Sequence, residues 1–464
     1  TTAPSVTLNT VQNLASTSTG ATGILTASTV TNAVVTQNTI TGLTATAGGF
    51  MGMSIAGASG GSFNVSQNTI SAINGTVGSS VSVIGIHITA TSPVTLNRNN
   101  ISGVTNNSTG TWGAFGINLG GGDGHIVTNN FVSNISQDMS GGGAFSTTFG
   151  VIGIRVASGI NHQVYHNSVN LYGVLPGTAA SSLLTAAFAI TGTTLTGCDV
   201  RNNIFANTIT GGTTSIAHVS VFLPTSGTTA MNLTWNNNAY FTGTTAGVHG
   251  VAHVGTTYTA TPAGPATYAG LYTVAAFDAS TTAGTGNFRS YTSNLLVANT
   301  NNDNASLAFT SAVPFTSSTN LHIPAATPGQ LESGGAAVGI TSDIDNDVRP
   351  GPAGSVNGGA TAADIGADEF DGTPASPMIY ISSTTTQNTN TVGNGTTNNH
   401  VIGIQVVTSG TLSPLSATSF TLNTNGSTAP LTDIANAKLW YTGNSSTFAT
   451  GTQFGATDPA PNGA

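Results

Sequence analysis

Histidines gather at two places in a chain that has few other ionisable side chains. Residues 162–173 read HQVYHNSVNLYG, and VHGVAH contains His249 and His253. Imidazole nitrogens ligate metals and act as general bases. Extended chain would separate His249 from His253 by about 13 Å, too far for one zinc ion. We interpret His166 as a residue that projects from the surface of a turn or strand without a second ligand.

Carboxylates are concentrated late in the chain, within residues 332–371. TSDIDNDVRPGP contains Asp343, Asp345 and Asp347, and alternating carboxylates in a turn can gather around a calcium ion. No glutamate follows at the twelfth position, so the loop departs from an EF-hand. The alternative is a solvated turn in which Arg349 pairs with Asp364 or Glu369. The sequence leaves both interpretations open.

Other reactive side chains carry weaker signals. GASGG, residues 57–61, matches the GxSxG nucleophile pattern, but a chain so rich in Gly and Ser matches it by chance, and the strand–elbow–helix setting is missing around Ser59. Cys198 is the single cysteine, which excludes an intrachain disulfide, and we expect a buried, inert thiol. Asp199 and Arg201 are expected to pair with each other. We therefore assign no catalytic residue.

The composition excludes several classes of partner. Only 5% of the 464 residues are charged, with six Lys plus Arg and a net charge of −9. Such a chain has no basic surface for nucleic acid or anionic lipid. No apolar run reaches the roughly 18 residues of a membrane span, so we expect none. The apolar fraction of 38% argues against disorder.

A repeat sets the framework for these residues. The pattern [VL]xxN recurs at intervals of 29 to 37 residues. Its asparagines are Asn9, Asn38, Asn68, Asn99, Asn130, Asn167, Asn203 and Asn236. A second series, of the type GIxV, runs in phase with the first. Units this short cannot enclose a core alone, so stacked units must share one.

The two series predict an all-β fold, a right-handed parallel β-helix, over residues 1–240. Equivalent residues in successive coils would lie about 4.8 Å apart. Stacked like charges repel at that spacing, whereas stacked asparagines form hydrogen bonds. We expect Asn38, Asn68, Asn99, Asn130, Asn167 and Asn203 to form this structural ladder.

The best candidate for ligand binding is an outward column on the GIxV strands. The column is predicted to contain Ser54, His87, Asn118, Arg155, Thr191 and Phe222. His87 and Arg155 would lie two coils, or roughly 10 Å, apart. We take His87, Asn118 and Arg155 as the candidate ligand-binding residues.

Several phrases resemble bacterial surface proteins. The two repeat series resemble the right-handed β-helix repeats of secreted and surface proteins. LHIPAATPGQLESGG, TSDIDNDVRPGP and ADIGADEFDG resemble the closing segment after such repeats in Bacteroidetes-type proteins. HVIGIQVVTSGTLSPLSATSFTLNTNG and DIANAKLWYTG resemble the Ig-like β-sandwich modules that follow. The resemblance implies final coils and a capping segment over 241–372 and an incomplete sandwich over 373–464.

The same resemblance implies a cargo of the type nine secretion system, located extracellularly or on the outer cell surface. We expect an adhesin, stalk or extracellular scaffold, with glycans as partners and the secretion machinery as a partner during export. The alternative is a polysaccharide lyase or hydrolase, or its carbohydrate-binding part. Ice binding is disfavoured because outward Thr pairs do not recur in register. Because the chain opens on Thr1 without a Met, we expect a processed protein or a fragment. Because only four or five strands fit before Ala464, fewer than a complete sandwich has, we expect the polypeptide to continue beyond it.

Overall fold

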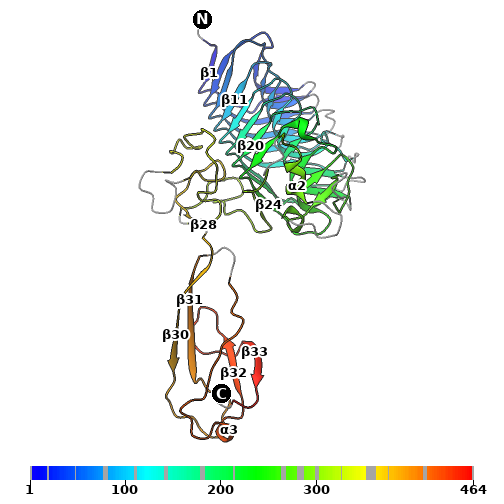
Figure 1. Cartoon of the computed structure of the whole chain (residues 1–464). Coiled ribbons are helices and arrows are strands. Elements are labelled where there is room, and N and C mark those ends of the chain that lie inside the picture. The colour runs from blue at the N-terminus through cyan, green and yellow to red at the C-terminus, as the bar shows by residue number, and fades with distance from the viewer. Residues whose placement is uncertain are drawn as a thin grey trace. The chain divides into compact units, whose positions relative to one another are not determined.

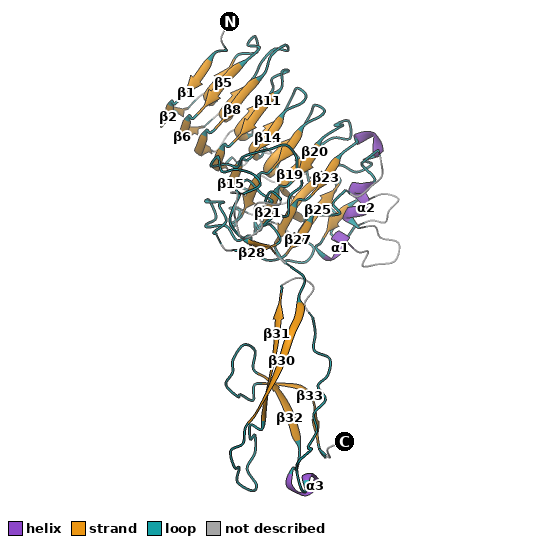
Figure 2. Ribbon diagram, turned by 60° about the vertical axis from the view of Figure 1, so that its left-hand side comes forward, coloured by secondary structure: helices purple, strands orange, loops and turns teal. Residues whose placement is uncertain are grey.

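The structure is a computed structural model, and its strands are arranged in two compact units, Thr1–Pro374 and Ala375–Ala464. It describes residues 3–17, 20–46, 49–76, 82–108, 112–140, 145–177, 183–212, 215–262, 268–278, 287–297, 302–325, 327–351, 362–374, 376–410 and 415–461. The first unit is a parallel β-solenoid, as the repeat predicts. Figures 1 and 2 show its strands stacked coil upon coil.

Most coils contribute one strand to each of three sheets, which the chain visits in turn. The first sheet contains β1 (Ser5–Thr7), β5 (Ala33–Thr36), β8 (Phe63–Ser66), β11 (Val94–Asn97), β14 (Ile126–Thr128), β17 (Gln163–Tyr165), β20 (Asp199–Arg201) and β23 (Thr234–Asn236). The second contains β2 (Thr10–Gln12), β3 (Ala15–Ser16), β6 (Thr39–Ala45), β9 (Thr69–Gly75), β12 (Asn100–Asn106), β15 (Phe131–Gln137), β18 (Ser168–Leu171), β21 (Ile204–Asn207), β24 (Ala239–Thr242) and β27 (Leu307–Phe309).

The third sheet contains β4 (Ala21–Thr26), β7 (Phe50–Ile55), β10 (Val83–Ile88), β13 (Ala114–Leu119), β16 (Gly150–Val156), β19 (Leu183–Ile190), β22 (Ile216–Leu223), β25 (His249–Val254) and β26 (Gly270–Tyr272). Neighbouring strands pair in parallel within these sheets, except β25 with β26, which is antiparallel. Inward side chains stack on their equivalents, as Val65, Leu96 and Val127 do. All three are fully buried and belong to one continuous apolar core.

The asparagines of the repeat lie one above the next at the turn between the first and second sheets. Asn99 shows the pattern. Its side-chain Nδ2 donates to Oδ1 of Asn130 at 2.9 Å and to the Val65 carbonyl of the preceding coil at 2.9 Å. Its own Oδ1 accepts from the backbone N–H and Nδ2 of Asn68. Each buried amide thus ties three coils together and satisfies the polar backbone of the turn.

The last member of this ladder differs from the prediction. Asn203 donates to Oδ1 of Asn238 at 2.9 Å, whereas Asn236 lies in β23. Trp235, predicted to precede a ladder asparagine, pairs with Val200 and is fully buried in the core. The position before the ladder residue belongs to Asn237.

The residue before each ladder asparagine adopts a left-handed backbone conformation. These residues are Leu8, Gln37, Gln67, Arg98, Asn129, His166, Asn202 and Asn237, with φ between 51° and 62°. Side chains other than glycine rarely adopt this region. The turn therefore bends sharply enough for the asparagine side chain to enter the column while its neighbour's side chain points to the flank.

Glycines of the GIxV series allow the third sheet to approach the core closely. A Cβ atom on Gly116 would lie 2.4 Å from Cγ1 of Val132 and 2.6 Å from the Gly153 carbonyl oxygen. Such distances are well inside van der Waals contact. The glycine column is therefore a steric requirement of the cross-section of the coil.

The end of the core column that follows the last parallel coils is covered by β26 and by short helices. These helices are η1 (Thr229–Met231), α1 (Ala275–Asp278) and α2 (Phe288–Ser293). Phe288 and Tyr291 of α2 are buried in the same core as Tyr240 and Tyr272. The apolar end of the solenoid is thus closed by residues that lie before the acidic region.

The described residues of 310–374 (310–325, 327–351 and 362–374), which we name the flanking segment, run beside the coils (Figure 1). We expected them to cap the last coil, but they contact the turn residues of several coils. Arg98 donates to Asn346 at 2.8 Å, and Asn237 donates to the Gly334 carbonyl at 2.9 Å. Ile323, Leu331, Ile365 and Phe370 form a second apolar cluster with the outer face of the second sheet. Within the flanking segment, the short strands β28 (Pro328–Gly329) and β29 (Thr373–Pro374) pair with each other.

The second unit contains antiparallel pairs. β30 (Ile379–Gln387) pairs with β31 (Ile402–Ser409), and β32 (Ala437–Tyr441) pairs with β33 (Thr452–Asp458); α3 spans Pro430–Asp433. Within the described residues these pairs are separate two-stranded sheets. Helices elsewhere are equally short: in the described parts of the chain, none has the length and apolar character to cross a membrane.

Candidate functional site

The histidines of HQVYHNSVNLYG belong to one coil and have structural partners. His162 stacks on His125 of the preceding coil, with ring centroids 5.0 Å apart. Nδ1 of His162 accepts from the His125 backbone N–H, and Nε2 faces the Ser158 carbonyl. A ring that accepts at one nitrogen and donates at the other is neutral. Burial accordingly lowers the pKa of His162, and that of His125 to about 4.

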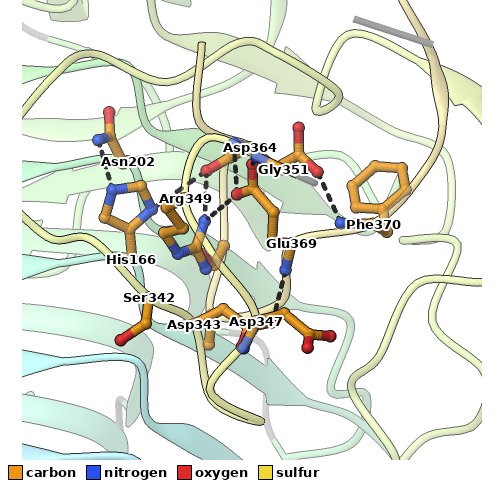
Figure 3. A network of polar contacts seen from close by, with 12 residues as sticks. His166, Asn202, Ser342, Asp343, Asp347, Arg349, Gly351, Asp364, Glu369 and Phe370 are labelled. Atoms are coloured by element: carbon orange, nitrogen blue, oxygen red, sulfur yellow. Dashed lines mark hydrogen bonds and ion pairs between the residues drawn. The ribbon is translucent and has the colours of Figure 1, made fainter. Parts of the chain in front are cut away.

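His166 corrects the prediction of a surface residue. It is 1% exposed because the flanking segment covers it. Nδ1 lies 3.1 Å from the Asp364 carbonyl, and Nε2 lies 2.9 Å from Nδ2 of Asn202 (Figure 3). Burial, and then the charge of Arg349, holds its pKa well below the usual range. The neutral ring therefore lies between the coil and the flanking segment and contacts both.

The remaining histidines of the coils also have separate partners. Nε2 of His249 lies 2.8 Å from the Ile209 carbonyl, while the His253 ring stacks on Phe222. The two do not share a ligand position in any cluster of metal-ligating groups among the described residues. Cys198 is a buried free thiol whose pKa burial raises to about 11. Ser59 lies in an exposed bend with no helix after it.

His87, Asn118 and Arg155 are brought together on the outer face of the third sheet. Nδ2 of Asn118 lies 2.8 Å from Nδ1 of His87, and Arg155 donates to Oδ1 of Asn118 at 3.0 Å. Burial, and then Arg155, lowers the pKa of His87, so the neutral ring accepts from Asn118. The three side chains therefore bond to one another, while Nε of Arg155 is buried without a hydrogen-bond partner among the described residues.

The surroundings of this chain of bonds differ from the predicted exposed column. Register places Ala189, not Thr191, beside Arg155. Asn118 is only 4% exposed, and Phe222 is fully buried. The outer face carries an apolar cluster that includes Phe115 and Phe145. The column is thus largely covered rather than an open groove.

The Asp343–Asp347 turn is organised by its first carboxylate. Oδ1 of Asp343 accepts from the backbone N–H groups of Asp345 and Asp347 at 2.9 and 2.8 Å, and Oδ2 accepts from Glu369 N–H at 3.0 Å. Asp343 is fully buried, whereas Asp345 and Asp347 are exposed. The three carboxylates do not form a ligand cluster among the described residues.

Arg349 forms a buried ion pair behind this turn (Figure 3). Its Nη1 lies 2.7 Å from Oε2 of Glu369, with both side chains at most 1% exposed. It also donates to the carbonyls of Asp364 and Gly366 at 3.2 and 2.9 Å. Burial and the charge of Glu369 raise the pKa of Asp364 to about 8. Of the two pairings considered from the sequence, the side-chain ion pair is with Glu369.

A cleft of about 310 Å³ opens where the flanking segment meets the coils. Its lining combines amide, hydroxyl, guanidinium, imidazole, carboxylate and apolar groups. The lining residues are Gln67, Asn68, Thr69, Arg98, Asn100, Phe131, His322, Ile344 and Asp345. The coil side comes from the ladder turns and the starts of β9, β12 and β15, while the other side comes from the flanking segment.

Two polar atoms of the cleft residues have no partner. Oδ1 of Asn100 and Nε of Arg98 are shielded from solvent and make no hydrogen bond to the described residues. Such buried, unpaired groups are rare and point to an unseen partner or a functional role. Asp345, at the other side, faces Nε2 of His322 at 2.7 Å.

Sequence reasoning missed most of this cleft. Asp345 was singled out, but with Asp343 and Asp347 rather than with His322. Arg98 carried no signal in the sequence beyond its place directly before Asn99 of the repeat. The cleft depends on contacts across more than 240 residues, such as Arg98 with Asn346. No local spacing signals such an approach.

Comparison of the chain with known proteins gives no relative from which a function could be transferred, so the geometry of the site is the basis for assigning one. No protein-family model, curated protein or solved structure matches the chain.

Proposed function

We propose that the chain is part of a secreted surface protein in which the solenoid is a rigid extracellular scaffold and the cleft binds a glycan. The observation that carries the proposal is the lining of the cleft. Its amide, hydroxyl and guanidinium groups match the hydroxyl-rich surface of a saccharide, and its volume of about 310 Å³ is at the lower end for ligand pockets. A short segment of a glycan chain fits this size.

The scaffold part of the proposal is supported by the nearly uncharged composition and by the continuous core. Every coil is joined to the next by backbone ladders and the asparagine column, which gives a stiff element. An adhesin or stalk of the Bacteroidetes type, exported by the type nine system and carrying an Ig-like module, is the setting that the sequence phrases favour. This finer assignment rests on that resemblance.

The test of glycan binding uses a matched pair of variants. Gln67 and Thr69 are exposed and line the cleft, whereas Gln37 and Thr39 are exposed at the equivalent positions one coil earlier. On a glycan array, the wild type should bind a defined subset of saccharides. Gln67→Ala/Thr69→Ala should reduce that binding at least about tenfold, while Gln37→Ala/Thr39→Ala should leave it unchanged. Equal binding by both variants would remove the cleft from the proposal.

One observation favours polysaccharide cleavage as the second candidate. Asp345 and Asp368 have carboxylate atoms within 4.8 Å of one another beside the cleft. Carboxyl pairs in retaining glycosidases are separated by about 5 Å. If the protein is such an enzyme, reducing ends should appear when it is incubated with an array-positive polysaccharide and should not appear with Asp345→Asn. Binding without release of reducing ends supports the scaffold.

A further inference from the structure

Three side chains of the flanking segment converge beside the cleft. One ligand atom from each of His322, Asp345 and Asp368 lies within 4.8 Å of the others. They come from three separate parts of the segment, so the fold rather than local sequence brings them together. Asp345 is exposed, His322 is partly exposed, and Asp368 is 7% exposed. The cluster therefore has a buried base and an open side.

Two of the three side chains, those of His322 and Asp368, are held in place by another contact. Nδ1 of His322 lies against Oδ1 of Asn320, which directs Nε2 towards the carboxylates. The ring packs edge-on against Phe131, with centroids 4.9 Å apart. Oδ2 of Asp368 accepts from the Ile323 backbone N–H at 2.6 Å. Metal-binding histidines are usually oriented in this way, by a hydrogen bond at the nitrogen that does not bind the metal.

The arginines near the cluster are engaged elsewhere. Arg98 donates to Ser342 and to Asn346, and Arg349 pairs with Glu369. Two carboxylates therefore face the imidazole without an arginine between them. A divalent cation at the centre would balance their charge and replace the contact between Nε2 of His322 and Asp345.

We propose that His322, Asp345 and Asp368 bind a divalent transition metal, for which Zn²⁺ is the probe. One imidazole and two carboxylates form a mixed nitrogen and oxygen ligand set that suits zinc. Calcium instead takes six to eight oxygen ligands, which this cluster does not supply. Three protein ligands would leave a coordination position open, and because Asp345 and His322 also line the cleft, the metal would lie at the edge of the cleft.

This inference goes beyond glycan binding and does not depend on it. The assay therefore contains no saccharide. The whole chain is freed of metal with a chelator and titrated with Zn²⁺ by calorimetry. We expect one Zn²⁺ per chain at this site, and a Ca²⁺ affinity at least about tenfold weaker.

Exposed positions supply variants that leave the core intact. Asp345→Asn and His322→Gln should each weaken Zn²⁺ binding at least about tenfold. Asp347→Asn, an exposed residue of the same turn, should leave it unchanged, as should Gln67→Ala/Thr69→Ala. Visible absorption of bound Co²⁺ provides a second readout, which His322→Gln should alter because it removes the nitrogen ligand.

Three outcomes overturn the site. One is the absence of stoichiometric Zn²⁺ binding by the wild type, which would leave a hydrogen-bonded His–Asp pair only. Another is Zn²⁺ binding that is the same in Asp345→Asn and His322→Gln as in the wild type. The third is tighter binding of Ca²⁺ that depends on Asp347. Loss of glycan binding in Gln67→Ala/Thr69→Ala with Zn²⁺ binding intact would separate the two proposals.

Discussion

The fold depends on a small set of residues whose backbone and side-chain roles are paired. In each ladder turn, one residue takes a left-handed conformation and the next, asparagine, enters the column. Gln67 and Asn68 form one such pair, and Arg98 and Asn99 form the next. The identity of the left-handed residue differs between coils, and the glutamine and arginine at these two positions both line the cleft.

Asn130→Ala should destabilise the solenoid strongly. The side chain donates to the carbonyls of Leu96 and Thr128 and to Asn167, and accepts two bonds from Asn99. Its removal leaves buried groups unpaired, at about 1–3 kcal/mol each. We expect the free energy of unfolding in denaturant to fall by about 3 kcal/mol or more. Asn9→Ala, at the exposed end of the ladder, should cost less than about 1 kcal/mol; equal losses would contradict the role of burial.

His218 should contribute a pH-dependent part of stability. Burial lowers its pKa from 6.5 to about 4, and its ring lies between Thr185 Oγ and the Gly211 carbonyl. A lowered folded-state pKa means that the contribution is complete above pH 6.5 and is lost as the pH falls towards 4. The difference in unfolding free energy between wild type and His218→Gln should therefore narrow by about 3 kcal/mol over that range. A difference that stays constant with pH would show that the ring is not buried in its neutral form.

At the scale of the element, the sequence patterns predicted the coils and, for most of them, which residues of successive coils lie beside one another. The asparagine series and the GIxV series together predicted the register of the coils as far as β16, because core packing and the asparagine ladder repeat locally. The prediction failed where the local pattern is ambiguous. The run of asparagines at 236–238 offers several choices, and only the pairing of Trp235 with Val200 selects Asn238. The Ala-rich β19 has no glycine to mark its phase, so Thr191 was placed where Ala189 lies.

Gly116→Ala tests the steric requirement of the third sheet. The added Cβ would meet Cγ1 of Val132 at 2.4 Å and the Gly153 carbonyl at 2.6 Å. Overpacking of this kind costs about 1–3 kcal/mol, and we expect the upper part of that range in denaturant unfolding. Gly192→Ala is the matched control, since its Cβ would lie 3.5 Å from Cδ1 of Leu195. Equal stability of the two variants would mean that the coil can widen without cost.

At the scale of the whole first unit, the flanking segment covers part of the coil surface and so determines which coil residues are buried and which line a cleft. It buries His166, completes the cleft beside Arg98 and brings His322 to Asp345. These contacts join residues far apart in the chain, and the apolar cluster around Ile365 and Phe370 provides much of the attachment. Sequence reasoning identified the acidic phrases but expected them at the end of the column, where α2 lies instead. The candidate site was therefore much less predictable than the coils.

The buried ion pair between Arg349 and Glu369 should control whether the flanking segment stays attached. Both side chains are almost completely buried, so removing one leaves an uncompensated charge, at a cost of about 3–5 kcal/mol. Arg349→Met should lower the unfolding free energy by that amount and make residues 310–374 sensitive to limited proteolysis at temperatures at which the coils remain folded. Arg349→Met/Glu369→Gln should recover part of the loss, because the amide carries no charge and its single oxygen can still accept from one of the two backbone N–H groups, those of Gly351 and Asp364, that now donate to the carboxylate. Arg201→Met breaks the partly exposed pair with Asp199 and should cost less than about 1 kcal/mol, without changing proteolysis of the segment. If Arg349→Met and the double variant were equally unstable, hydrogen bonding and packing by the arginine, rather than charge compensation, would hold the segment on the coils.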